Sequence, residues 1–148
     1  MVEFALAAPI AFVLVLGIVV VAIVASNQNR LTNTARDAAR AAAVCGTGTA
    51  YAVLPNGQPC TTAAALSYTT AELQKIDGSY PWSPTLGVID SSGAPAGSSL
   101  SDCATGRQVV VRAACAQPLF VPMIGVLIGN PSTNTRTLQA TAEATCEQ

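Results

Sequence analysis

The chain of 148 residues carries one uncharged apolar segment that extends from Phe4 to Ala25. As an α-helix this segment is about 33 Å long, enough to cross a hydrocarbon layer of about 30 Å. A cleavable signal peptide is the alternative, but its apolar region usually has only about 7–15 residues and follows a basic start. Here the start is Met1-Val2-Glu3, which is acidic, and no small-residue cleavage motif follows. The sequence therefore predicts a helix made for a membrane or for an apolar bundle.

The helical pattern continues beyond this segment and becomes amphipathic. Small or apolar residues recur at spacings of three and four, which places them on one helix face; they are Leu31, Ala35, Ala38, Ala42 and Cys45. Polar residues occupy the other side, where Asp37 can pair with Arg40 three residues later. We expect one continuous helix over residues 1–45, about 65 Å long. Residues 1–25 form its apolar part and residues 26–45 its amphipathic part.

Three residues of the apolar part are candidates for contacts with other chains. Pro9 lacks an amide hydrogen, so we expect it to kink or locally open the helix. Gly17 permits close approach of another backbone, although ordinary variation among membrane helices explains both residues equally well. Glu3 would cost a few kcal/mol if it entered hydrocarbon unpaired. The helix dipole offsets part of this cost, and the α-amino group of a neighbouring chain could supply the rest. A solvated acid just outside the membrane remains the alternative.

Residues 46–148 have the composition of a small β-rich head. Turn residues recur in this part, a short helix is predicted over residues 61–76, and a strand over residues 86–90. Residues 108–115 and 138–146 alternate in polarity, which predicts antiparallel strands with one buried and one wet face. The strongly apolar connection over residues 118–131 suits an assembly or membrane-proximal surface. We expect the head to lean on the amphipathic part of the long helix.

The cysteines predict an oxidising, extracytoplasmic environment. All five lie after the apolar segment, and none forms a C-x-x-C pair. Without histidine, this pattern argues against a zinc site and for disulfides that staple a thin core. Antiparallel neighbouring strands would favour Cys103–Cys146 over Cys115–Cys146, and Cys45–Cys60 would close a short loop. The sequence leaves the pairing open.

Composition argues against most other functions. Charged residues make up 10% and hydrophobic residues 51%, with a net charge of −1, so there is no basic surface for nucleic acid. The chain has no histidine, phosphate-binding loop, nucleophile elbow or carboxylate cluster, so we expect no enzyme, metal or cofactor. Asp77, Asp90 and Asp102 are expected to cap turns. The aromatic residues of Tyr80-Pro81-Trp82 are expected to pack on the core, with a sugar or peptide platform as the alternative.

The chain carries four motifs, which are V-E-F-A-L-x-x-P at residues 2–9, L-T-N-x-A-R-D-A-A-R at residues 31–40, V-V-V-R near Val109, and L-Q-A-T-A-E-A from Leu138. Together they resemble the TadE-like proteins of the tight-adherence (Tad) branch of type IV pilins. The resemblance implies an α+β lollipop fold, in which a long helix carries a small antiparallel head. It also implies a prepilin peptidase, an inner-membrane assembly machinery, and helices that pack into a filament. The chain departs from the pattern because two residues, and not four, precede the glutamate at position 3.

The function expected from this resemblance is that of a structural pilus subunit for surface attachment. The chain would lie in the bacterial inner membrane before assembly and on the cell surface afterwards. The expected inter-subunit residues are Met1, Glu3, Phe4, Pro9 and Gly17. The alternatives are a minor pseudopilin that primes or tips the fibre, and a single-span protein with an extracytoplasmic binding head.

Overall fold

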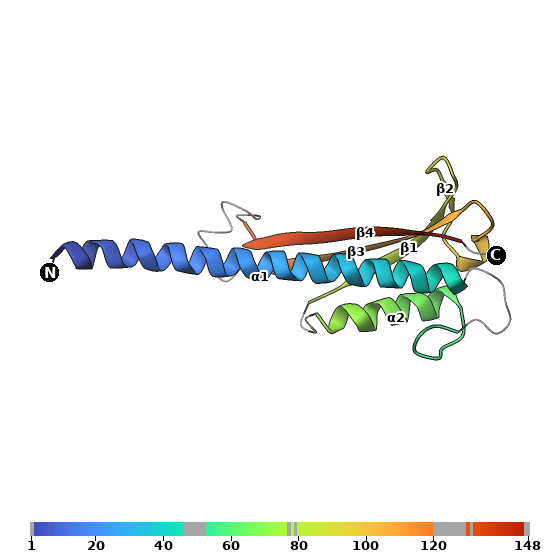
Figure 1. Cartoon of the computed structure of the whole chain (residues 1–148), viewed down its shortest axis with the longest axis horizontal. Helices are drawn as coiled ribbons and strands as arrows, with labels where there is room; N and C mark the ends of the chain where they lie inside the picture. Colours follow the sequence, from blue (N-terminus) through green and yellow to red (C-terminus); the bar gives the residue numbers. More distant parts are fainter. Residues whose placement is uncertain are drawn as a thin grey trace.

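The structure is a computed structural model that describes residues 2–45, 53–76, 78, 80–119, 130 and 132–146. In the first helix, side chains are described from Ala7 onward. Figure 1 shows a long helical rod, α1 (Val2–Cys45), whose second half is flanked by a small head. The fold is thus the α+β lollipop expected from the sequence.

Helix α1 has 44 residues and contains Pro9. It continues through Pro9 without interruption, so the missing amide hydrogen does not end the helix. The other helix of the head, α2 (Thr62–Gln74), is slightly shorter than expected. Its N-cap is Thr61, whose side chain accepts a hydrogen bond from the amide of Ala64.

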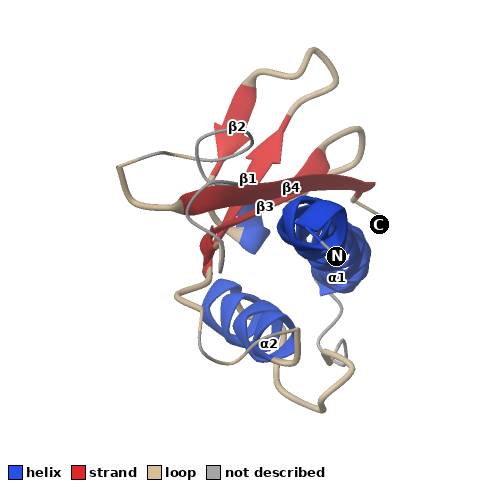
Figure 2. Ribbon diagram, turned by 90° about the vertical axis from the view of Figure 1, so that its left-hand side faces the viewer, coloured by secondary structure: helices blue, strands red, loops and turns tan. Residues whose placement is uncertain are grey.

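The head contains one antiparallel sheet of four strands in the order β2-β1-β3-β4. The strands are β1 (Ser83–Ile89), β2 (Pro95–Gly97), β3 (Gln108–Pro118) and β4 (Thr135–Thr145). A short 3₁₀ helix, η1 (Leu100–Asp102), links β2 to β3. Figure 2 shows α1 and α2 on the same face of this sheet.

The core lies between that face and the two helices. From the sheet it takes the alternate residues Val109, Val111, Ala113, Leu138, Ala140 and Ala142. The alternation predicted from the sequence is therefore present in both long strands. Val110 is an exception, because it lies on the face expected to be wet and is nevertheless buried. It occupies a central strand, opposite Gly87 on one side and Glu143 on the other.

Strand β2 was not predicted from the sequence, and the predicted ranges of the other three strands were too short. β1 begins at Ser83, β3 continues to Pro118 and β4 begins at Thr135, each extending beyond its predicted range. The extra residues of β3 and β4 include two threonines, a glutamine, an arginine and a proline, which alternation of apolar residues does not reveal. Most of the predicted apolar connection, residues 120–129 and 131, lies outside the described residues.

Candidate assembly surface

The first half of α1 exposes large apolar side chains all around its circumference. Ile10, Phe12 and Ile18 are 65%, 65% and 70% exposed. The other exposed large side chains of this segment are Val13, Leu14, Val15, Leu16, Val19, Val21 and Ile23. We call residues 7–19, which project beyond the head as a helix about 20 Å long, the free rod. An exposed apolar surface of this extent is unstable in water and requires lipid or another protein.

The head begins to cover α1 at Val20. Val20 and Val24 are only 6% and 9% exposed, whereas Val19 and Val21 on adjacent faces are 48% and 51% exposed. Residues four apart lie on one helix face, so the head covers a single stripe of the apolar segment here. The apolar segment therefore extends beneath the foot of the head, and its outer side stays uncovered.

Small side chains let the sheet lie close to the second half of α1. The buried alanines on this face are Ala35, Ala38, Ala39 and Ala42, and Leu31 is fully buried among the core residues. A side-chain hydrogen bond joins α1 to the sheet, from Gln28 Nε2 to the carbonyl oxygen of Gln139 at 2.7 Å. This bond and the alanine face fix where β4 lies along the helix.

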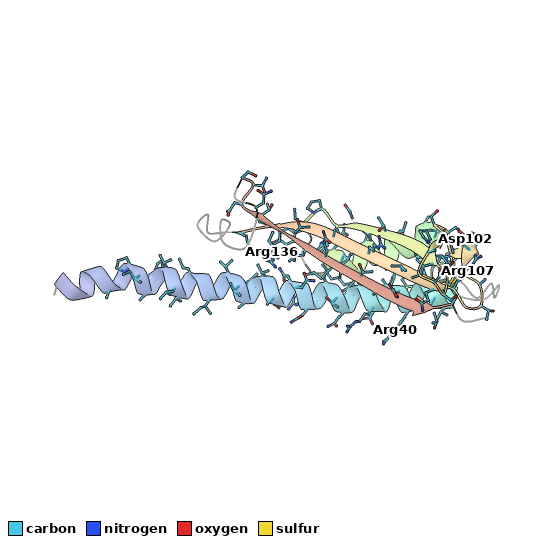
Figure 3. The ribbon with its side chains drawn as sticks, turned by 90° about the horizontal axis from the view of Figure 1, so that it is seen from above. Arg40, Asp102, Arg107 and Arg136 are labelled. Atoms are coloured by element: carbon cyan, nitrogen blue, oxygen red, sulfur yellow. A yellow bond between two sulfur atoms is a disulfide. The ribbon has the colours of Figure 1, made fainter. Side chains whose placement is uncertain are left out.

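A cavity of about 300 Å³ lies where the start of β4 meets the helix, and we call it the foot cavity. It is lined by Val21, Val24, Ala25, Gln28, Arg136, Thr137 and Leu138. Arg136 is exposed, and among the described residues of this lining it is the only charged one. Figure 3 shows Arg136 at the end of the head nearest the free rod, whereas Arg40, Asp102 and Arg107 lie toward the opposite end. Arg136 therefore lies beside the apolar segment of α1.

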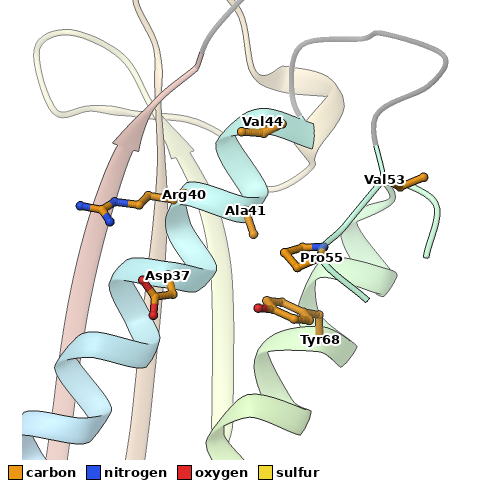
Figure 4. A pocket seen from close by; sticks show the side chains of 7 residues that line it. All are labelled: Asp37, Arg40, Ala41, Val44, Val53, Pro55 and Tyr68. Atoms are coloured by element: carbon orange, nitrogen blue, oxygen red, sulfur yellow. The ribbon is translucent and has the colours of Figure 1, made fainter. Parts of the chain in front are cut away.

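A second cleft lies between α1, α2 and the segment around Pro55 (Figure 4). Figure 4 shows the ring of Tyr68 near Pro55 and Ala41, while Asp37 and Arg40 extend from α1. The sequence spacing suggested an ion pair between Asp37 and Arg40. Among the described residues, the ion pair that forms is Glu72–Lys75, and Asp37 does not pair with Arg40. Burial raises the pKa of Tyr68, and the nearby charge of Glu72 adds to the effect. The hydroxyl is therefore protonated at neutral pH, and the cleft offers no activated nucleophile.

Two disulfides close the head at the end farthest from the free rod. Cys45 is bonded to Cys60, and Cys103 to Cys146. These are the two pairings that the sequence favoured. Cys115 is buried on the core face of β3 and belongs to neither bond. Among the described residues, no group of three potential ligands is placed to hold a metal ion.

The aspartates expected to cap turns do so where they are described. Asp90 accepts hydrogen bonds from the Ser92 hydroxyl and from the amides of Ser92 and Ala94. These bonds, led by that of the Ser92 hydroxyl, lower the pKa of Asp90. Asp102 accepts from the Ser99 amide in a capping box. Asp77 lies outside the described residues.

Tyr80 and Trp82 pack on the core, as expected from the sequence. Trp82 is buried, and the half-buried ring of Tyr80 meets it edge-on at a centroid distance of 6.2 Å. This packing leaves no flat aromatic platform for a sugar at this position.

The residues expected to join subunits are described to different degrees. Pro9 and Gly17 lie in the free rod. For Glu3 and Phe4 the structure gives only the helical backbone, and Met1 lies outside the described residues. Sequence reasoning did not single out Arg136. The available signal was an arginine at the start of a strand that directly follows an apolar connection.

By length and composition, α1 is suited to cross a membrane. Over Ala7–Cys45 it contains a window with a mean hydropathy of 3.0, of which 11% is buried. The low burial separates this segment from the core helix of a globular protein. A signal sequence passes the same test of length and composition.

The family model described as TadE-like protein matches residues 1–40. Residues 1–40 are thus similar to TadE-like proteins. The match covers the TadE-like helix up to its last turns and supports the resemblance drawn from the motifs at residues 2–9 and 31–40. No curated protein and no solved structure matches the chain.

Proposed function

We propose that the chain is a structural subunit of a helical, extracellular pilus of the Tad type that serves surface attachment. The observation that carries the proposal is the free rod, whose apolar side chains are exposed around the whole helix while the head covers only the second half of α1. Before assembly, the rod lies in the inner membrane. After assembly, the rods of identical chains replace the lipid around one another.

The same arrangement determines where the head lies in the assembly. It is fixed to the amphipathic part of α1 by a continuous core, so each rod added to the bundle brings one head to the outside. Such contacts join different surfaces of identical chains, and an assembly of this kind grows as a fibre when the rotation between neighbours does not close a ring. A prepilin peptidase and an inner-membrane machinery are the partners that the TadE-like resemblance supplies for this process.

The proposal is tested by separating sheared cell-surface material from detergent-solubilised membranes and quantifying the chain in both fractions. A main structural subunit is expected to dominate the sheared fibres, as counted by mass spectrometry. A few copies per fibre would support a subunit that primes or tips the fibre. Recovery in the membrane fraction alone would contradict the proposal and support a single-span anchored protein.

A further inference from the structure

The foot cavity lies just beyond the free rod and has a largely apolar wall. Val21, Val24 and Ala25 contribute to this wall from α1, and Leu138 contributes to it from β4. Val21 and Ala25 are exposed, so the wall continues the uncovered apolar surface of the rod. An apolar cavity of about 150 Å³ can bind benzene, and the foot cavity, at about 300 Å³, is larger. It therefore has room for an apolar side chain as large as a phenyl ring.

The two largest polar side chains of the same lining already have partners. Gln28 Nε2 donates a hydrogen bond to the carbonyl oxygen of Gln139. Arg136 also has an interaction within the structure, so its charge does not call for a ligand of opposite charge. A guanidinium group that keeps the hydrogen bonds at its edges can still offer its flat face to an aromatic ring. The cavity is thus suited to an uncharged, apolar occupant.

The free rod carries side chains of this kind. Between Ala7 and Val19 it has no charged residue, and its one aromatic residue is Phe12, which is 65% exposed. Aromatic side chains bury a large apolar area and contribute most to an interface where they fill a pocket. In a fibre outside the membrane no acyl chain covers the wall of the foot cavity, so another chain must exclude water from it.

Resting on the proposed function, we infer that the foot cavity of one subunit receives the Phe12 side chain of a second copy that packs alongside it. The α1 residues of the lining are centred near Val24, and Phe12 precedes Val24 by 12 positions. A parallel second copy is then displaced along the axis by about 18 Å, towards the head. The contact fixes the stagger between neighbouring subunits, because the cavity occupies one level of the helix.

Moving the aromatic ring from the neighbour to the cavity's own wall tests this contact. Phe12→Ala leaves the cavity unfilled and Ala25→Phe blocks it, so each is expected to reduce the fibre yield at least about tenfold. The double variant regains much of the yield, because its own ring at position 25 fills the cavity. The chain in the membrane fraction is quantified in parallel, and its amount is expected to stay unchanged.

Leu14→Ala is the matched control for this rescue. Leu14 belongs to the same rod, is 63% exposed and lies on the opposite side of the helix from Phe12. Adding Ala25→Phe to Leu14→Ala is expected to lower the fibre yield further, since the neighbour's Phe12 ring then competes for a filled cavity. A normal yield from Ala25→Phe alone, or rescue of both rod variants or of neither, overturns the inference.

A cross-linking measurement covers the case in which the variants disturb membrane insertion. Photoreactive benzoylphenylalanine replaces Phe12 in the full chain, and the assembled fibres are irradiated. The expected product is a dimer in which position 12 is joined to residues 21–28 or 136–138 of another copy, as mapped by mass spectrometry. The same label in place of Leu14 is expected to give dimers joined elsewhere. A label at position 12 that joins only other rods, or only lipid, defeats this inference alone, whereas a wild-type chain that forms no fibres defeats the proposed function.

Discussion

At the scale of single residues, small side chains and carboxylates decide how closely the elements of the head approach. The buried alanines of α1 let the sheet lie against the helix, and Gly97 lets β2 lie against η1. A Cβ atom at Gly97 would lie 2.1 Å from Asp102 Oδ2. The carboxylate of Asp102 is not free to move away, because it accepts the hydrogen bond from the Ser99 amide.

The substitution Gly97→Ala is therefore expected to destabilise the head by about 1–3 kcal/mol through overpacking and loss of this cap. The measurement is thermal unfolding of the full chain in detergent micelles, followed by circular dichroism. Gly87→Ala is the control, since its nearest atom would be the Gly97 carbonyl oxygen at 3.8 Å, an ordinary contact. Equal melting temperatures for Gly97→Ala and Gly87→Ala would show that Asp102 does not hold this position.

The substitution Glu3→Ala is expected to abolish or sharply reduce surface fibres while membrane insertion remains intact. Removing the charge makes the apolar segment easier to insert, but it deletes the acidic group that we expect to stabilise contacts between copies. The measurement compares the chain in sheared and membrane fractions. Glu72→Ala serves as control, because Glu72 belongs to an ion pair on the surface of α2. A normal fibre yield from Glu3→Ala would remove this residue from the account of assembly.

At the scale of elements, α1 has two different neighbours along its length. Its second half shares a core with β3, β4 and α2, whereas no residue of the free rod belongs to that core. The rod thus depends on other molecules, and Gly17 is the position where its backbone is least shielded by side chains.

For this reason Gly17→Leu is expected to leave membrane insertion unchanged and to reduce fibre yield about tenfold or more, since overpacking costs about 1–3 kcal/mol at each contact. Leucine keeps the segment apolar but fills the groove that glycine leaves open. Val19→Leu provides the control, because it changes an exposed side chain of the same rod by little volume. Wild-type amounts of fibre from Gly17→Leu would mean that the rods do not approach closely at this level.

The two disulfides are expected to differ in their contribution to head stability. Cys103–Cys146 spans 43 residues and Cys45–Cys60 spans 15. By loop-closure entropy, removing them costs about 4 and about 3 kcal/mol, respectively. Urea unfolding of Cys103→Ala/Cys146→Ala and of Cys45→Ala/Cys60→Ala measures the difference. A greater loss from the second pair would show that anchoring the end of α1 outweighs chain entropy.

Much of this element structure could be predicted from the sequence, because its signals are local. The spacing of Leu31, Ala35 and Ala38 indicates a helix face, and the alternation over residues 138–146 indicates a strand with one buried side. The burial of Val110 could not be predicted, since it depends on β3 lying between β1 and β4. The position of Arg136 beside Val21 depends on the packing of β4 along α1, a contact between residues far apart in sequence.

At the scale of the whole molecule, one chain carries surfaces suited to two solvents. The head and the amphipathic part of α1 share one core that two disulfides close, and such bonds persist in an oxidising environment. The free rod is suited to lipid or to other rods. Because both parts belong to one uninterrupted helix, the position of the rod determines where the head is displayed (Figure 1).

The central claim is that the rod finally packs among copies of itself. Electron microscopy of natively purified material, sheared from cells and kept free of detergent, tests this claim most directly. The account predicts fibres composed mainly of this chain. Dispersed particles that remain soluble only in lipid or detergent, with no polymer in any native preparation, would contradict it.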